Sequence, residues 1–151
     1  MHTVETVVSF EAAHRLYNVD TYSKECSTSV HGHSYRARIV AGRKELNDAG
    51  MVIDFKRFKE IIRDNIERKY DHSLILRECD PLVEKFREVA PEQHLNVVKE
   101  SPTAEWMAED FFNEIQSQLN LIDSEVQVMS VSVQETENNI ATYLRRCCNE
   151  N

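Results

Sequence analysis

The stretch TVETVVSF, residues 3–10, decides the first element of the fold, because apolar and polar side chains alternate along it. Val4, Val8 and Phe10 fall on one side of an extended chain, and polar residues fall on the other. Such alternation among β-branched residues is typical of a half-buried strand. The segment SYRARIVA, residues 34–41, repeats the pattern and predicts a second strand.

Two segments farther along the chain change to a helical period. The first begins at Asp54, a residue suited to accept the free N–H groups of a first turn, and ends near Lys69. The second begins at residues 101–103, Ser-Pro-Thr, a typical helix start. Between them, Asp80-Pro81 predicts a short third helix. The apolar stripe of the second helix comprises Ala104, Met107, Ala108, Phe111, Ile115 and Leu119.

The chain ends in two more predicted strands, residues 126–133 and 140–144, joined by the polar turn Glu137-Asn138-Asn139. The order ββααββ predicts an α+β fold in which two helices cover one face of a four-stranded antiparallel sheet. Such a sheet has two open edges, so we expect copies of the chain to join edge to edge into an oligomeric barrel. No linker or repeat divides the sequence, so we expect one domain over residues 1–151.

Composition excludes several function classes. Lys and Arg number 18 against 26 Asp and Glu, and the net charge of −8 argues against a nucleic-acid partner. No apolar run approaches the ~20 residues of a membrane span, and no signal peptide is visible, so we expect a soluble cytoplasmic protein. The cysteines fit no secreted disulfide spacing and are expected to be thiols. They are Cys26, Cys79, Cys147 and Cys148.

Three of the six histidines form a pattern that suits a metal ion. Residues two apart on a strand point to the same side, so His31 and His33 aim at one point, and a neighbouring strand can bring His14 there. Three neutral imidazoles with an open fourth position are the layout of catalytic zinc. The alternative is a half-buried strand edge with hydrogen-bonded rings. His2 and His94 lack such company and are interpreted as solvated.

Motifs along nearly the whole chain resemble the 6-pyruvoyl-tetrahydropterin synthase and 6-carboxytetrahydropterin synthase family. The matching segments are FEAAHR (10–15), Cys26 before HGHSY (31–35), GMVIDF (50–55), YDH (70–72), PTAE (102–105), and QET (134–136) followed by Asn138, Asn139 and Tyr143. The resemblance implies a zinc enzyme of the tunnelling fold that acts on 7,8-dihydroneopterin triphosphate. It also implies a barrel closed across a trimer, with two trimers stacked into a homohexamer.

The resemblance assigns roles to individual residues. His14, His31 and His33 match the zinc ligands, Cys26 matches the general base, Asp71 and His72 match a second acid/base pair, and Glu135 matches the pterin anchor. One carboxylate can accept both the ring N–H and the exocyclic amine of a pterin. In the family the Asp-His pair faces the cysteine of a neighbouring subunit. The alternative interpretation is that Cys26 is an inert loop thiol and that Asp71-His72 belongs to an ordinary loop after a helix.

The cysteine segment departs from the family pattern. Four residues separate Cys26 from His31, whereas the usual family spacings are three or five. A three-residue spacing would place Ser27 at the catalytic position, and some family members use a glutamate of this loop, which makes Glu25 an alternative base. A cysteine acts as a base only when ionised, which requires a nearby cation such as Lys24 or Arg15.

The leading hypothesis is a zinc-dependent lyase that forms 6-carboxy-5,6,7,8-tetrahydropterin and releases acetaldehyde and triphosphate, as in queuosine and deazapurine synthesis. The alternative is a 6-pyruvoyl-tetrahydropterin synthase of tetrahydrobiopterin synthesis, which the turn at residues 135–139 somewhat resembles. No dinucleotide-binding fingerprint is present, so no nicotinamide cofactor is expected. Hypotheses from other classes are a non-catalytic pterin or zinc-binding module and an acidic interaction domain without a site.

Overall fold

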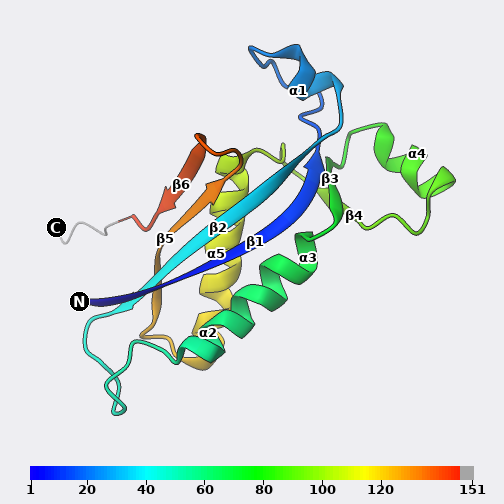
Figure 1. The fold of residues 1–151 in the computed structure, drawn as a ribbon. Coiled ribbons are helices and arrows are strands. Elements are labelled where there is room, and N and C mark those ends of the chain that lie inside the picture. Colours follow the sequence, from blue (N-terminus) through cyan, green and yellow to red (C-terminus); the bar gives the residue numbers. More distant parts are fainter. Residues whose placement is uncertain (147–151) are drawn as a thin grey trace.

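The computed structural model describes residues 1–146 (Figure 1). Its elements are β1 (His2–His14), α1 (Lys24–Thr28), β2 (His31–Arg43), α2 (Phe55–Ile62), the π-helical turn η1 (Arg63–Glu67), α3 (Arg68–Tyr70), β3 (Ser73–Arg77), α4 (Leu82–Val89), β4 (Leu95–Val98), α5 (Ala104–Ile122), β5 (Gln127–Gln134) and β6 (Ile140–Leu144). Cys26 and Cys79 are free thiols, whereas Cys147 and Cys148 lie outside the described residues. Within those residues, no helix combines the length and apolar character needed to cross a membrane.

The strands form one sheet in the order β4-β3-β1-β2-β5-β6. The pairs β1·β2, β2·β5 and β5·β6 are antiparallel and correspond to the four predicted strands. However, β3 pairs in parallel with the end of β1, and β4 pairs in parallel with β3. The prediction of a four-stranded, wholly antiparallel sheet is therefore wrong: the sheet has six strands and is mixed.

The two additional strands escaped prediction because they are short and carry no alternation. β3 has the sequence SLILR, and its first four residues are all buried. A short apolar run of this kind is buried on both faces, as parallel strands are, and periodicity does not distinguish it from a helical segment. β4 has four residues and no buried side chain. β3 follows the crossover through α2, η1 and α3, and β4 follows the crossover through α4, a helix that begins just after Asp80-Pro81 as predicted.

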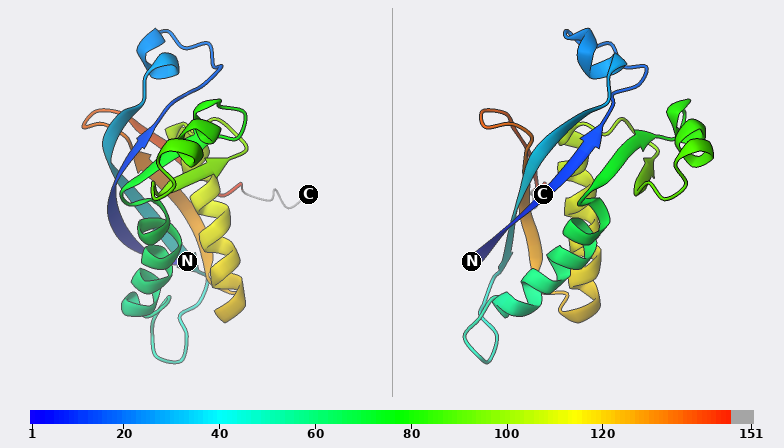
Figure 2. Two further views of the ribbon diagram at one scale, coloured as in Figure 1. Left: turned by 90° about the vertical axis from the view of Figure 1, so that its right-hand side faces the viewer. Right: turned by 45° about the vertical axis from the view of Figure 1, so that its right-hand side comes forward.

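Both predicted long helices lie on one face of the sheet (Figure 2). Asp54 caps α2 by accepting a hydrogen bond from the Arg57 N–H at 3.0 Å, and Thr103 caps α5 by accepting from the Trp106 N–H at 3.2 Å. The apolar side chains of β1 and β2 alternate into this face, where Phe10 stacks on Tyr35 with ring centroids 5.1 Å apart. The other face of these strands carries exposed residues.

The sheet ends in β4 on one side and in β6 on the other, and neither has an outer neighbour within the described residues. The outer side of β1 is also largely open, because it pairs with β3 only over Ala12–His14. The Glu11 N–H and carbonyl face away from β2, because they bond to the Asp71 carboxylate and the His72 N–H. Backbone groups alternate along a strand, so those of Val7 also face outward.

Candidate functional site

Three histidine side chains converge at one end of the β1·β2 ladder. His14 is the register partner of His31, and His33 lies opposite Ala12, so all three rings point to the helix-covered face. The Nε2 atoms of His14 and His31 are 3.1 Å apart. One ligand atom from each ring lies within 4.8 Å of the others. The structure thus brings together His31 and His33 of the His-x-His pattern and His14 of the neighbouring strand, as the sequence predicts.

The hydrogen bonds of these rings define which nitrogen carries the proton. His14 Nδ1 donates to the Pro102 carbonyl at 2.8 Å, and His31 Nδ1 donates to the Ser29 carbonyl at 3.0 Å. In neutral rings both Nε2 atoms are then acceptors, which cannot hydrogen-bond to each other. The Nε2 atom of His33 is buried and has no hydrogen-bond partner in the described part of the chain. Two converging lone pairs beside a buried ring nitrogen that lacks a partner fit a metal ion.

Burial keeps this site in the protonation state that a metal requires. His14 is 1% exposed, and its burial lowers the pKa from 6.5 to about 4, despite the opposing bond to the Pro102 carbonyl. Burial also lowers the pKa of His33, although the negative charge of Glu135 acts in the opposite direction. Neutral imidazoles are ready to bind a metal at neutral pH without first releasing a proton.

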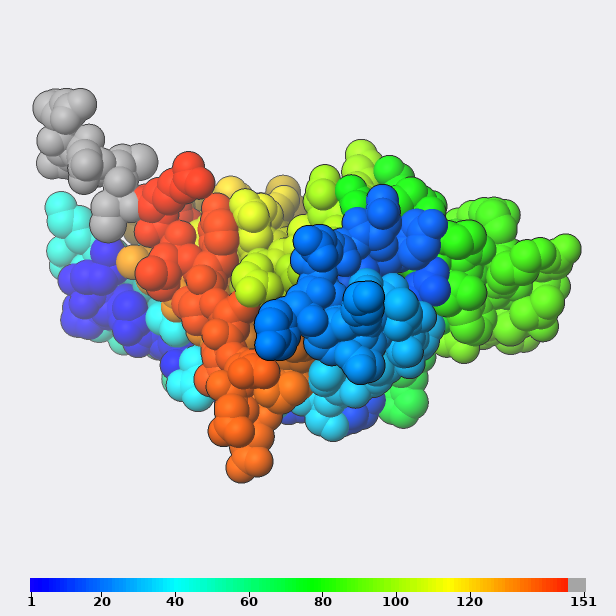
Figure 3. Space-filling model, turned by 90° about the horizontal axis from the view of Figure 1, so that it is seen from above, coloured from blue at the N-terminus to red at the C-terminus, as the bar shows by residue number. Residues whose placement is uncertain are grey.

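Glu135 follows β5 and faces both the histidines and a cavity. Its Oε1 atom lies 3.5 Å from His14 Nε2 and 3.8 Å from His33 Nε2. The cavity beside it has a volume of about 600 Å³ and is lined by the β5–β6 turn, the start of α5 and the loop after β1. That loop and the turn lie side by side at the top of the molecule (Figure 3). Sequence reasoning placed Glu135 at a pterin but did not predict its approach to the histidines.

Cys26 lies in α1, a short helix within the segment expected to be a loop. The Cys26 side chain is half-buried, and its carbonyl accepts from the Leu16 N–H at 2.9 Å. This bond ties the cysteine segment to the residues that follow His14. Glu25 is fully exposed and accepts a hydrogen bond from the Ser23 hydroxyl, which lowers the pKa of the Glu25 carboxyl.

Arg15, one of the two cations proposed near Cys26, is engaged elsewhere. Its Nε donates to Asp80 Oδ2 at 2.8 Å, and its Nη2 donates to Asp80 Oδ1. Asp80 is 2% exposed and also caps α4 by accepting from the Leu82 N–H at 2.8 Å. Arg15 therefore joins the end of β1 to the β3–α4 turn, a long-range contact that sequence reasoning missed.

The Asp71–His72 pair is held in place between α3 and β3. Asp71 accepts from the Glu11 N–H at 2.9 Å and from His72 Nδ1 at 2.8 Å. These bonds lower the pKa of the Asp71 carboxyl, and the bond to Glu11 contributes most. The His72 N–H donates to the Glu11 carbonyl at 2.7 Å, and its φ of 56° is unusual for a non-glycine residue. Strain of this kind is often found at functional sites.

The Asp71–His72 pair makes no contact with the three histidines within the described part of the chain. The His72 side chain is 83% exposed and borders a cavity of about 500 Å³ together with Glu11, Ser34 and His33. Alternation along β1 and β2 puts Glu11 and Ser34 on the face opposite His14 and His33. The second acid/base pair therefore shares a cavity with His33 but does not contact the histidine cluster of the same chain.

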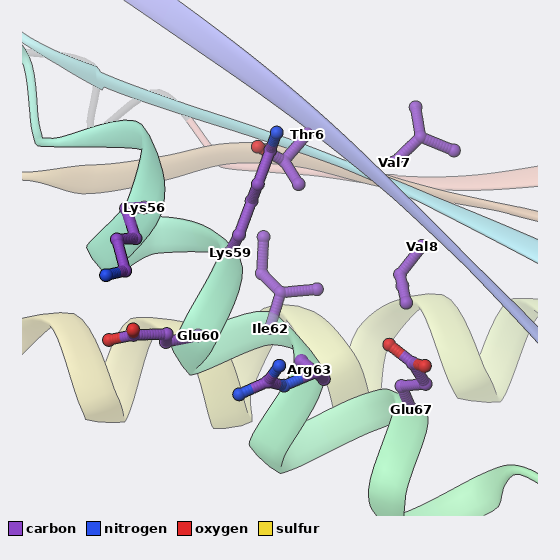
Figure 4. Close-up of a pocket in the computed structure, with 9 residues that line it drawn as sticks. All are labelled: Thr6, Val7, Val8, Lys56, Lys59, Glu60, Ile62, Arg63 and Glu67. Atoms are coloured by element: carbon purple, nitrogen blue, oxygen red, sulfur yellow. The ribbon is translucent and has the colours of Figure 1, made fainter.

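A further cavity, about 510 Å³ in volume, lies between α2, η1 and β1 (Figure 4). Lys56, Lys59 and Arg63 line it from the helical side, and Thr6 and Val7 line it from the strand. None of the predicted site residues borders this cavity. It lies along the part of β1 that has no outer neighbour within the described residues.

Comparisons with known proteins agree with this fold. A family model described as 6-pyruvoyl tetrahydropterin synthase matches residues 3–146. A 6-carboxy-5,6,7,8-tetrahydropterin synthase of Rickettsia typhi is 33% identical over 131 residues, which cover 87% of this chain and 91% of that protein. An Aquifex aeolicus protein with the same name is 30% identical and is covered to 92% of its length. The structure of Caenorhabditis elegans 6-pyruvoyl tetrahydropterin synthase superposes with a TM-score of 0.66 at 28% identity and covers 96% of each chain. The resemblance found in the sequence motifs is thereby confirmed: the chain belongs to the 6-pyruvoyl tetrahydropterin synthase family.

Proposed function

We propose that the chain is a zinc-dependent lyase that converts 7,8-dihydroneopterin triphosphate to 6-carboxy-5,6,7,8-tetrahydropterin, with release of acetaldehyde and triphosphate. The convergence of ring nitrogens from His14, His31 and His33 is the observation that carries the proposal. The names of the Rickettsia typhi and Aquifex aeolicus relatives support the carboxy product. A place in queuosine and deazapurine synthesis is part of this proposal. The likeness to the Caenorhabditis elegans structure favours a second candidate, the 6-pyruvoyl product.

The three histidines would hold the ion, which when bound supplies a Lewis acid for the side-chain hydroxyls of the substrate. Glu135 anchors the pterin ring by accepting its ring N–H and exocyclic amine, and the cavity of about 600 Å³ next to Glu135 has room for the ring. Cys26 removes a proton from the substrate side chain. These roles place substrate recognition at the β5–β6 turn and proton transfer at α1.

Asp71 and His72 act as a second acid/base pair, in which the Asp71 carboxylate orients the imidazole through Nδ1. Because this pair makes no contact with the histidines of its own chain within the described residues, we infer that it serves the site of a neighbouring copy. The open edges of β1 and β6 support that association. The cavity between α2, η1 and β1 (Figure 4) leaves room for a second strand along β1. A homohexamer built from two trimers is the proposed assembly.

A cytoplasmic location is part of this proposal, because Cys26 must persist as a free thiol to act as a base.

Product analysis tests the proposed reaction. Purified, zinc-loaded protein is given 7,8-dihydroneopterin triphosphate, products are identified by mass spectrometry, and acetaldehyde is trapped. A 6-carboxy product with acetaldehyde is expected, whereas a 6-pyruvoyl product would establish the second candidate. Substrate that binds stoichiometrically and persists would refute the enzyme and favour a pterin-binding module.

A further inference from the structure

The Glu135 carboxylate lies close to the three clustered histidines, although a residue that only anchors a pterin needs no such contact. Its Oε1 atom is 3.5 Å from His14 Nε2 and 3.8 Å from His33 Nε2. Two donor atoms bound to one tetrahedral zinc ion lie about 3.4 Å apart, given bond lengths of about 2.0–2.2 Å. The carboxylate oxygen is thus spaced from two of the three rings as a further ligand of the same ion would be.

The chemistry of the four groups agrees with that spacing. The Nε2 atoms of His14 and His31 are acceptors, because their Nδ1 atoms donate to carbonyls, and the Nε2 atom of His33 has no hydrogen-bond partner in the described residues. The Glu135 carboxylate adds a further acceptor beside the Nε2 acceptors of His14 and His31, and such an arrangement is repulsive unless a cation lies among the three groups. Three imidazoles and one carboxylate are all common zinc ligands.

The backbone of Glu135 is fixed while its side chain is free to turn. The Glu135 N–H donates to the Asn139 carbonyl at 3.1 Å, which closes the turn after β5. The side chain is 24% exposed and borders the cavity of about 600 Å³. Rotation about its own torsions can therefore move the carboxylate between the histidines and the cavity without moving the strand.

We propose that Glu135 is an exchangeable fourth metal ligand, which occupies the open coordination position until a pterin ring draws its carboxylate into the cavity. This inference rests on the proposed function, because it needs both the metal at the three histidines and the pterin at Glu135. Both carboxylate oxygens must face the flat donor pair of the ring, so pterin binding turns Oε1 away from the metal. The reactive position then opens only when the correct ring is bound.

Cobalt(II) binding tests the proposal, because the visible spectrum of this ion reports the number and type of its ligands. The full chain is titrated with cobalt(II) as wild type and as E135Q. We expect E135Q to bind the ion at least about 10-fold more weakly and to show a different visible spectrum. E137Q is the matched control, since it removes an exposed carboxylate two residues away, and it should behave as wild type.

The second step adds a dihydropterin without hydroxyls or phosphates to the cobalt-loaded wild type, so that only the ring can act. The spectrum should move toward that of E135Q without pterin. Equal affinity and equal spectra for wild type and E135Q would overturn the proposal while leaving the metal site intact. If the two proteins differ but pterin leaves the wild-type spectrum unchanged, Glu135 is a permanent ligand and the exchange is disproved. A wild type that binds no cobalt(II) would instead refute the metal site of the proposed function.

Discussion

Buried His14 should make the metal-free protein lose stability in mild acid. In the unfolded chain an imidazole has the ordinary pKa of 6.5, whereas burial lowers the pKa of His14 in the folded chain to about 4. Between these values the unfolded state binds more protons than the folded state. The neutral His14 ring therefore makes its full contribution to the free energy of unfolding above about pH 6.5, and this contribution is lost as the pH falls toward 4.

The size of the effect follows from the two values. A tenfold change in proton affinity is worth about 1.4 kcal/mol, so the drop from 6.5 to about 4 lowers the free energy of unfolding by up to about 3 kcal/mol. At pH 5 the loss relative to pH 7.5 should be about 2 kcal/mol. Full burial of the ring, which is 1% exposed, leaves little solvent to screen this effect.

Urea unfolding of chelator-treated protein at pH 7.5, 6 and 5 measures the loss directly. H14N keeps an N–H donor for the Pro102 carbonyl but removes the titrating ring, so its stability should fall less over the same range. H94Q removes an exposed imidazole and should retain the wild-type slope. A wild-type free energy of unfolding that stays constant from pH 7.5 to pH 5, or an H14N slope equal to that of the wild type, would refute the reasoning.

Three further predictions concern the base, a buried ion pair and the open edge. C26A should keep metal content and thermal stability but lose at least about 100-fold in turnover; unchanged turnover would move the base role to another residue such as Glu25. D80N should lower the free energy of unfolding by about 3–5 kcal/mol, because it leaves the Arg15 charge without its partner. Urea titrations measure this loss, and the control E78Q on the exposed turn should change the free energy of unfolding by less than about 0.5 kcal/mol. V7P removes an outward backbone N–H and should shift the protein to a smaller species in analytical ultracentrifugation. V7T keeps this N–H and serves as the control. Equal sedimentation of the two variants would argue against association along β1.

Local pattern was sufficient for most elements of the fold. Strand alternation and helical period depend only on which neighbours share a side of the backbone, and capping by Asp54 and Thr103 involves a residue three positions away. The same reasoning placed His31 and His33 on one side of β2. The motifs also identified the family that the comparisons confirm.

Tertiary structure decided the features that depend on where distant segments meet. The helical segment α2–α3 returns the chain beside β1, where β3 pairs in parallel, and α4 returns it beside β3, where β4 pairs in parallel. Strands of five and four residues are too short to show a period that predicts these crossovers. The hydrogen bond from His14 to the Pro102 carbonyl, 88 residues away, also cannot be predicted from the sequence, since every residue has a carbonyl. The sequence by itself thus determined the elements, the histidine pattern and the family. Only the packed chain decided that Glu135 meets those histidines and that His72 does not, because contacts across the fold depend on its three-dimensional path.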